Sequence, residues 1–173
     1  MKIPELQQKL KESHASFIST IQKVADVDFT KSTNGKWTGG QQLEHIVKAV
    51  DPVNKAFALP GFMLKLSFGK AKRPSRSYDQ LVEKYQGKLA GGYNVSKRFT
   101  PATVALNQRE ALIAKLEKLT ISLNRRISGF NEKQLDLLIL PHPLLGKLTL
   151  REMIYFTIYH AGHHEKQVIE NLK

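Results

Sequence analysis

The chain of 173 residues contains no cysteine. Disulfide bonds, thiolate metal ligands and a cysteine nucleophile are therefore all excluded. A metal ion would have to be bound by imidazole, carboxylate or backbone oxygen. A thiol can enter the chemistry only as part of a substrate.

Long apolar stretches are also missing. No stretch approaches the run of about 18 consecutive apolar residues that a membrane-spanning helix requires. The first residues, Met1–Gln8, lack the continuous apolar core of a secretion signal. We therefore expect a cytoplasmic protein without a membrane-spanning segment.

Acidic residues are scarce, at 15 against 27 lysines and arginines, which gives a formal net charge of +12. Between Pro52 and Tyr78 there is no acidic residue, and the basic ones are Lys55, Lys65, Lys70, Lys72, Arg73 and Arg76. We interpret this segment mainly as a solvated loop, with attraction of carboxylate-bearing substrates as a weaker alternative. Nucleic-acid binding is a further alternative that we do not favour, because the aromatic residues follow helical core spacing and no nucleic-acid-binding motif is present.

The length suits a single domain spanning residues 1–173. Proline and glycine separate helical patterns, and neither a strand pattern nor an internal repeat is found. The long helices are expected at about 4–24, 38–57 (with Pro52 kinking it or ending it early), 101–129 and from 149 to the C-terminus. The sequence therefore predicts an all-α fold, a four-helix bundle with at least one crossover connection and short additional helices.

Local capping signals mark several helix starts. A capping residue followed three positions later by Gln or Glu is a helix-start pattern, and it begins at Thr38, Ser77, Asn131 and Thr149. Two of these starts open the shorter helices, one running from Ser77 to about Ala90 and one following Asn131. Pro101 predicts the start of the third long helix, because proline is tolerated in a first turn. The segment 61–76 is expected to be a basic connection.

Two histidines lie one turn apart on the last helix. At about 100° per residue, His164 lies roughly 40° from His160, on the same inward stripe as Met153. His163 lies about 60° to the other side of His160, which suggests a position behind a ligand or at the surface. Imidazoles at this spacing can bind one ion, and a third ligand would have to come from another helix.

His45 is the best candidate for the third ligand, since it lies at the edge of the apolar stripe of its helix. His14 is the second choice, because it lies on the apolar face of the first helix. His142 stands between two prolines, where a turn or surface position is expected. Spacing alone leaves open that these are ordinary core histidines bonded to backbone carbonyls.

Three segments, Trp37–His45, His142–Thr149 and His160–Gln167, together resemble the DinB-like superfamily, which includes bacillithiol-transferase-like proteins. The resemblance implies that His45, His160 and His164 bind a divalent transition metal. Zinc or nickel is favoured, with iron, manganese and cobalt as alternatives. Gln167 matches the glutamine of the family pattern. We expect Gln167, His163 and His14 to support the ligands rather than bind the ion.

Three neutral imidazoles would leave a coordination position open, as in catalytic rather than structural sites. The resemblance implies hydrolysis, or transfer of a low-molecular-weight thiol co-substrate to an electrophile, with a small-molecule substrate. The catalytic residues stay unassigned, because Glu44 and Glu165 both project away from the inward histidines. A metal-binding sensor without turnover is the alternative.

The segment Met153–Tyr159 is apolar or aromatic nearly all the way round. Tyr155 and Tyr159 project away from the inward stripe and must face something else. Minor helices of the same chain would cover them in a monomer, and a second copy would cover them in a homodimer. We favour the homodimer, because tyrosine is enriched in such interfaces.

Overall fold

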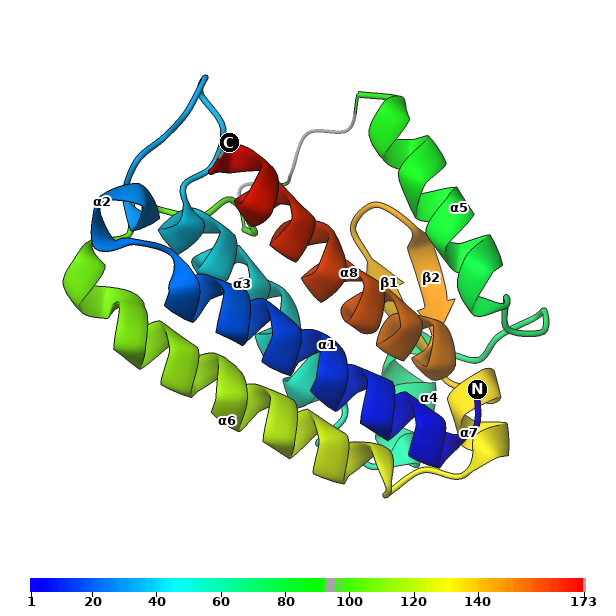
Figure 1. Cartoon of the computed structure of the whole chain (residues 1–173). Helices are drawn as coiled ribbons and strands as arrows, with labels where there is room; N and C mark the ends of the chain where they lie inside the picture. Colours follow the sequence, from blue (N-terminus) through cyan, green and yellow to red (C-terminus); the bar gives the residue numbers. More distant parts are fainter. Residues whose placement is uncertain (93–95, 97, 173) are drawn as a thin grey trace.

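The computed structural model describes residues 1–92, 96 and 98–172. Its four long helices are α1 (Ile3–Lys23), α3 (Gly39–Ala56), α6 (Arg109–Ile127) and α8 (Leu150–Asn171). α1 packs against α6 and α8, and α3 packs against the same two helices, so α1 and α3 occupy opposite corners (Figure 1). The links from α1 to α3 and from α6 to α8 therefore cross the bundle. The prediction of an all-α four-helix bundle with a crossover connection is confirmed.

Short elements occupy the connections. They are α2 (Asp26–Phe29), α4 (Gly61–Phe68), α5 (Tyr78–Ala90), a 3-10 turn η1 (Leu106–Gln108), α7 (Glu132–Leu137), β1 (Ile139–His142) and β2 (Gly146–Thr149). α5 and the hairpin of β1 and β2 lie on the same side of α8 (Figure 1).

The four predicted capping boxes are all formed. In each, the capping side chain accepts the backbone N–H three residues on, and that residue's side chain accepts the N–H of the cap. The boxes at Thr38 and Thr149 begin α3 and α8, the two helices that carry the candidate metal ligands. Local sequence thus defines where both helices start.

Two helix predictions need correction, and one of the two alternatives for Pro52 is excluded. α6 begins at Arg109 rather than Pro101, and in the segment before it the Ala102 N–H donates to Glu44 (2.6 Å). α3 continues through Pro52 to Ala56 instead of ending early. The predicted connection 61–76 contains the helix α4.

The hairpin of β1 and β2 was not predicted. Ile139 pairs with Thr149 and His142 with Gly146, in an antiparallel ladder of four residue pairs. Gly146 has φ of 76°, a conformation that glycine adopts without steric cost. The hairpin leads directly into α8 and places His142 at its turn.

The core fills the space between the long helices. Phe17, Leu43, Leu116 and Ile154 are fully or almost fully buried side chains, one from each of these helices. Gly40 marks a close approach, since a Cβ there would lie 2.9 Å from the Cβ of Val104. No side chain larger than hydrogen fits at this position without displacing its neighbours.

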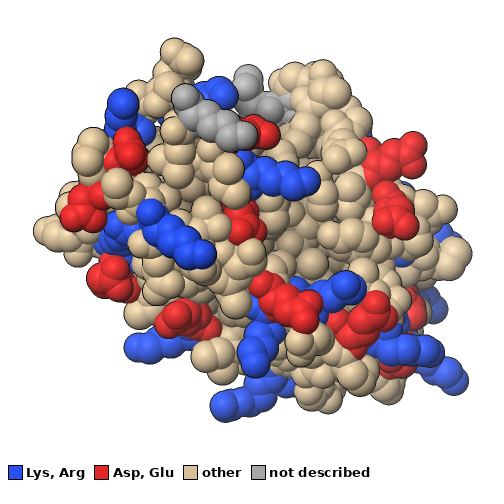
Figure 2. Space-filling model, in the orientation of Figure 1, with Lys and Arg blue, Asp and Glu red and all other residues tan. Residues whose placement is uncertain are grey.

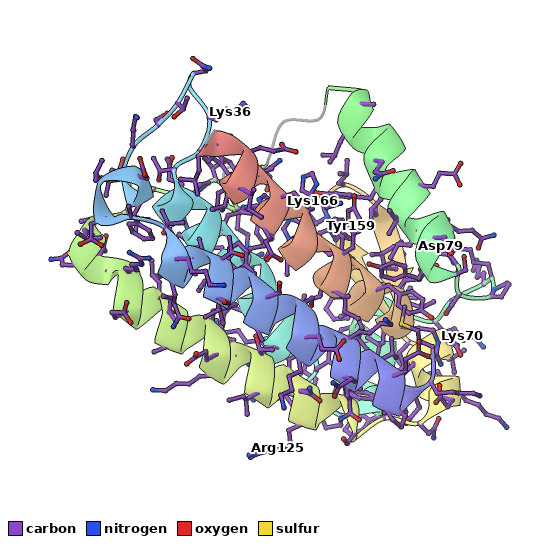
Figure 3. All side chains as sticks on the ribbon, viewed as in Figure 1. Lys36, Lys70, Asp79, Arg125, Tyr159 and Lys166 are labelled. Atoms are coloured by element: carbon purple, nitrogen blue, oxygen red, sulfur yellow. The ribbon has the colours of Figure 1, made fainter. Side chains whose placement is uncertain are left out.

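Residues of the same chain cover the tyrosines of α8. Tyr155 is 3% exposed and its ring lies 5.6 Å from that of Tyr78 on α5. The Tyr159 hydroxyl accepts a hydrogen bond from Gln86 of α5 (2.9 Å), on the side of α8 that faces α5 (Figure 3). The apolar circumference of α8 is therefore explained without a second copy.

Part of the basic segment has a structural role, which corrects the expectation of a solvated loop. Glu152 is fully buried in the first turn of α8, and it pairs with Arg73 (2.6 Å) and Arg76 (3.2 Å). These two arginines anchor the segment before α5 to α8. On the face drawn in Figure 2, basic and acidic side chains are interspersed and form no single basic patch. Within the described part of the chain, no helix is long and apolar enough to cross a membrane.

Candidate metal centre

Three histidine nitrogens converge between α3 and α8. The Nε2 atom of His160 lies 3.2 Å from Nε2 of His45 and 3.0 Å from Nε2 of His164. One ligand atom from each residue falls within 4.8 Å of the other two, and all three side chains are buried. The separations are close to the about 3.3 Å between ligand atoms of a tetrahedral ion bound at 2.0–2.1 Å.

Two of the rings are held in one tautomer by their other nitrogen. Nδ1 of His45 donates to the backbone carbonyl of Phe99 (2.7 Å), and Nδ1 of His164 donates to the side-chain oxygen of Gln42. A neutral ring protonated on Nδ1 has a bare Nε2. Both lone pairs face Nε2 of His160, which can supply a proton to only one of them. A cation at the centre would satisfy all three, so the donor set fits a metal ion.

Burial keeps the three rings neutral. It lowers the pKa of His45, and it lowers the pKa values of His160 and His164 to well below the usual 6.5. The positive charges that His164 and His45 would carry further lower the pKa of His160, and that of His45 further lowers the pKa of His164. Because protons compete with metal ions for imidazole nitrogen, low pKa values favour metal binding near neutral pH.

Two further side chains shape the cluster, and sequence analysis did not assign them this role. The Trp37 ring lies 4.9 Å from that of His45 and is stacked at 6.1 Å on that of His164. Gln42 is 2% exposed and orients His164. Both belong to the segment that carries the family resemblance, which is the only signal that singled them out.

The other predicted site residues fall outside the cluster. Gln167 donates to Nε2 of His163 (3.1 Å), so it lies beside the cluster. The His163 ring packs 5.2 Å from the ring of His164. His14 is buried on α1, where its Nδ1 donates to the carbonyl of Leu10 (2.9 Å). The structure brings His45, His160 and His164 together and leaves His14 apart.

A cavity of about 600 Å³ opens beside the cluster. His45 and His160 form part of its wall, and most of the rest is apolar, with Phe68, Leu89, Leu144, Met153 and Phe156 among the lining residues. None of the described residues that line it is acidic. Glu44 instead pairs with Lys48 (3.1 Å), and Glu165 accepts hydrogen bonds from two hydroxyl groups of α1.

His142 lies at the hairpin turn, in line with the turn alternative of the prediction, and it also lines this cavity, which the prediction did not include. Its ring lies 4.2 Å from that of Phe156, in an edge-on contact. The hairpin turns the residue inward. No local pattern in the sequence signals this contact between the hairpin and α8.

The sequence model of the DinB superfamily matches residues 30–168, which include all three histidines of the cluster. The chain belongs to the DinB superfamily. This DinB-superfamily chain also has the fold of a solved structure of YfiT from Bacillus subtilis, described as a probable metal-dependent hydrolase with an unusual four-helix bundle topology. The TM-score is 0.61 and the identity 18%, over 97% of this chain and 84% of that one. No curated protein matches the chain.

Proposed function

We propose that His45, His160 and His164 bind one divalent transition metal ion through their Nε2 atoms. The observation that supports this most strongly is the convergence of three buried nitrogens, two of them with tautomers fixed by Phe99 and Gln42. Hydrogen bonds from the far nitrogen are the usual means of orienting histidine ligands. Zinc or nickel is the first expectation, since imidazole suits both.

We further propose that the protein is a metal-dependent enzyme acting on a small molecule in the cytoplasm. When bound, the ion would supply a Lewis acid with an open coordination position. The cavity beside His45 and His160 would bind the apolar body of the substrate and exclude water from it.

Hydrolysis is the favoured reaction, because YfiT, which shares the fold, is described as a probable metal-dependent hydrolase. Transfer of a low-molecular-weight thiol is the second candidate. The chain has no cysteine that would compete with a thiol co-substrate for the ion. The cavity favours either reaction over a sensor that has no substrate.

Metal content tests the binding step. Protein purified without an affinity tag should contain about one equivalent of metal, and His160→Ala should lose it. His163→Ala is the matched control, because this neighbouring residue lies outside the three-nitrogen cluster and should leave the metal in place. Equal metal content in wild type and His160→Ala would refute the proposed site.

Turnover tests the reaction. Wild type and His160→Ala are assayed with a panel of esters and amides, and in parallel with low-molecular-weight thiols and electrophiles. Activity in either panel that disappears in His160→Ala supports an enzyme and selects the reaction. Full metal content with no turnover in either panel would favour the sensor.

The homodimer stays a prediction. The tyrosines that suggested it are covered by α5, so it now rests only on the frequency of two-fold assemblies. Sedimentation at micromolar concentration tests it, and a single species near 19.6 kDa would contradict the dimer.

A further inference from the structure

His142 has a fixed tautomer. Its Nδ1 atom accepts hydrogen bonds from the backbone N–H groups of Leu144 (3.2 Å) and Leu145 (3.0 Å). Backbone N–H groups can only donate, so Nδ1 must carry a lone pair. In the neutral ring the proton is therefore on Nε2. This is the reverse of His45 and His164, which are protonated on Nδ1.

The ring is also neutral and held in place. Burial lowers its pKa to about 4, with a smaller contribution from the positive charge of Lys84. Lys84 donates to the carbonyl of Leu145 (3.1 Å), and Phe156 packs edge-on against the imidazole. The turn, α5 and α8 thus fix the ring from three sides.

Nε2 of His142 is the ring nitrogen that remains available to bind a ligand. Among the described residues no acceptor bonds to it, yet it is not one of their fully enclosed, unpaired polar atoms. It is therefore accessible, and because His142 lines the cavity together with His45 and His160, a ligand bound there would contact this residue. A donor in largely apolar surroundings gains when a ligand supplies an acceptor, because leaving it unpaired on desolvation costs free energy.

We propose that His142 is a substrate-binding residue whose Nε2–H donates to a carbonyl oxygen of a largely apolar substrate. A neutral donor suits a neutral oxygen, or one that gains only partial charge, better than a full anion. The apolar wall of the cavity binds the body of the same molecule. This role for His142 rests on the proposed function as far as the nature of the reacting centre is concerned. The hydrogen bond itself depends only on His142 and the cavity.

Two substitutions separate the roles of the two ring nitrogens. His142→Asn keeps an acceptor near the Nδ1 position, for the N–H groups of Leu144 and Leu145, and loses the distal donor. His142→Gln keeps a donor near the Nε2 position. The ligands are acetophenone and α-methylstyrene, which have the same shape and differ by a carbonyl oxygen in place of a methylene group.

Binding of the two ligands is measured by NMR titration, with metal-free and with zinc-loaded protein. The quantity compared between proteins is the preference, that is, the ratio of the affinities for acetophenone and α-methylstyrene. His142→Asn should lose roughly three- to tenfold of this preference, which is the range of one neutral hydrogen bond, and His142→Gln should keep more of it. An unchanged ratio of the two affinities in His142→Asn would overturn the proposal.

The tautomer itself is tested in wild type, which avoids any effect of a variant on folding. Nitrogen-15 spectra of histidine-labelled protein should show His142 protonated on Nε2, and protonation on Nδ1 would overturn the proposal. A failure of the proposed metal site can be distinguished from a failure of the proposed role of His142. If His160→Ala kept its metal while His142→Asn lost the carbonyl preference, the metal site would be wrong and the role of His142 would stand.

Discussion

His14 is a buried titratable group, and only its burial and one backbone hydrogen bond shift its pKa. Its side chain is 1% exposed on α1, Nδ1 donates to Leu10, and Nε2 has no hydrogen-bond partner in the described part of the chain. Burial lowers its pKa from 6.5 to about 4, and the hydrogen bond to Leu10 only partly opposes this. The folded protein therefore holds this ring in its neutral form.

The shift makes stability depend on pH. The unfolded chain takes up a proton on His14 as the pH falls through 6.5, whereas the folded chain does so only near pH 4. Between these values the unfolded state binds more protons, so the free energy of unfolding falls as the pH is lowered. From pH 7.5 to pH 5.0, His14 should contribute a loss of about 2 kcal/mol.

Urea denaturation of metal-free wild type and His14→Gln, each at pH 7.5 and 5.0, measures this contribution. The quantity compared is the loss of unfolding free energy between the two pH values. The other buried histidines contribute equally to this loss in both proteins, and a pH-independent cost of the substitution cancels in the difference between the two pH values. The loss should be smaller in His14→Gln by about 2 kcal/mol. The same loss in both proteins would refute the argument that His14 is neutral because it is buried.

Three further substitutions test packing and capping by chemical denaturation. Gly40→Ala should destabilise the fold by about 1–3 kcal/mol, because the new Cβ would meet Val104 at 2.9 Å, and unchanged stability would mean that the backbone yields there. Glu152→Gln should cost about 2 kcal/mol, since the buried carboxylate loses its charge-assisted bond to Arg73, and a neutral result would show that the pair contributes no stability. Thr38→Ala should cost about 1 kcal/mol through loss of the cap of α3, whereas a loss below a few tenths would contradict the capping role.

The single tryptophan provides a direct readout of the site. Because Trp37 lies beside His45 and His164, Ni²⁺ added to metal-free wild type should quench its fluorescence at about one equivalent. His164→Ala should weaken this response and His163→Ala should preserve it. Equal quenching in His164→Ala would place the ion elsewhere.

The features that the sequence predicted well depend on neighbouring residues. The capping boxes at Thr38 and Thr149 join residues three apart, and His160 and His164 share a face because of helical geometry. The inward stripe correctly separated His163 from this pair. The position of His45 opposite them could be predicted only from the family resemblance, because no pattern of neighbouring residues shows that α3 packs against α8.

The features that were missed depend on distant contacts. The start of α6 at Arg109 has no capping side chain to mark it, and the segment before it makes a contact with another helix, from the Ala102 N–H to Glu44. The hairpin was missed because its strands are four residues each and one contains Pro141. The position of His142 beside the cavity follows from that hairpin. Because the hairpin was not predicted, this position was not predicted either.

The hydrogen bond from His45 to the carbonyl of Phe99 links two parts of the molecule thermodynamically. Phe99 also lines the cavity, so the same residue orients a candidate metal ligand and shapes the space where a substrate would lie. A ligand that favours one position of this carbonyl would change the affinity of the histidine cluster for its ion. By linkage, the ion would change the affinity for that ligand by the same factor. One peptide group would then make the loading of the protein with metal and its occupancy by substrate mutually dependent.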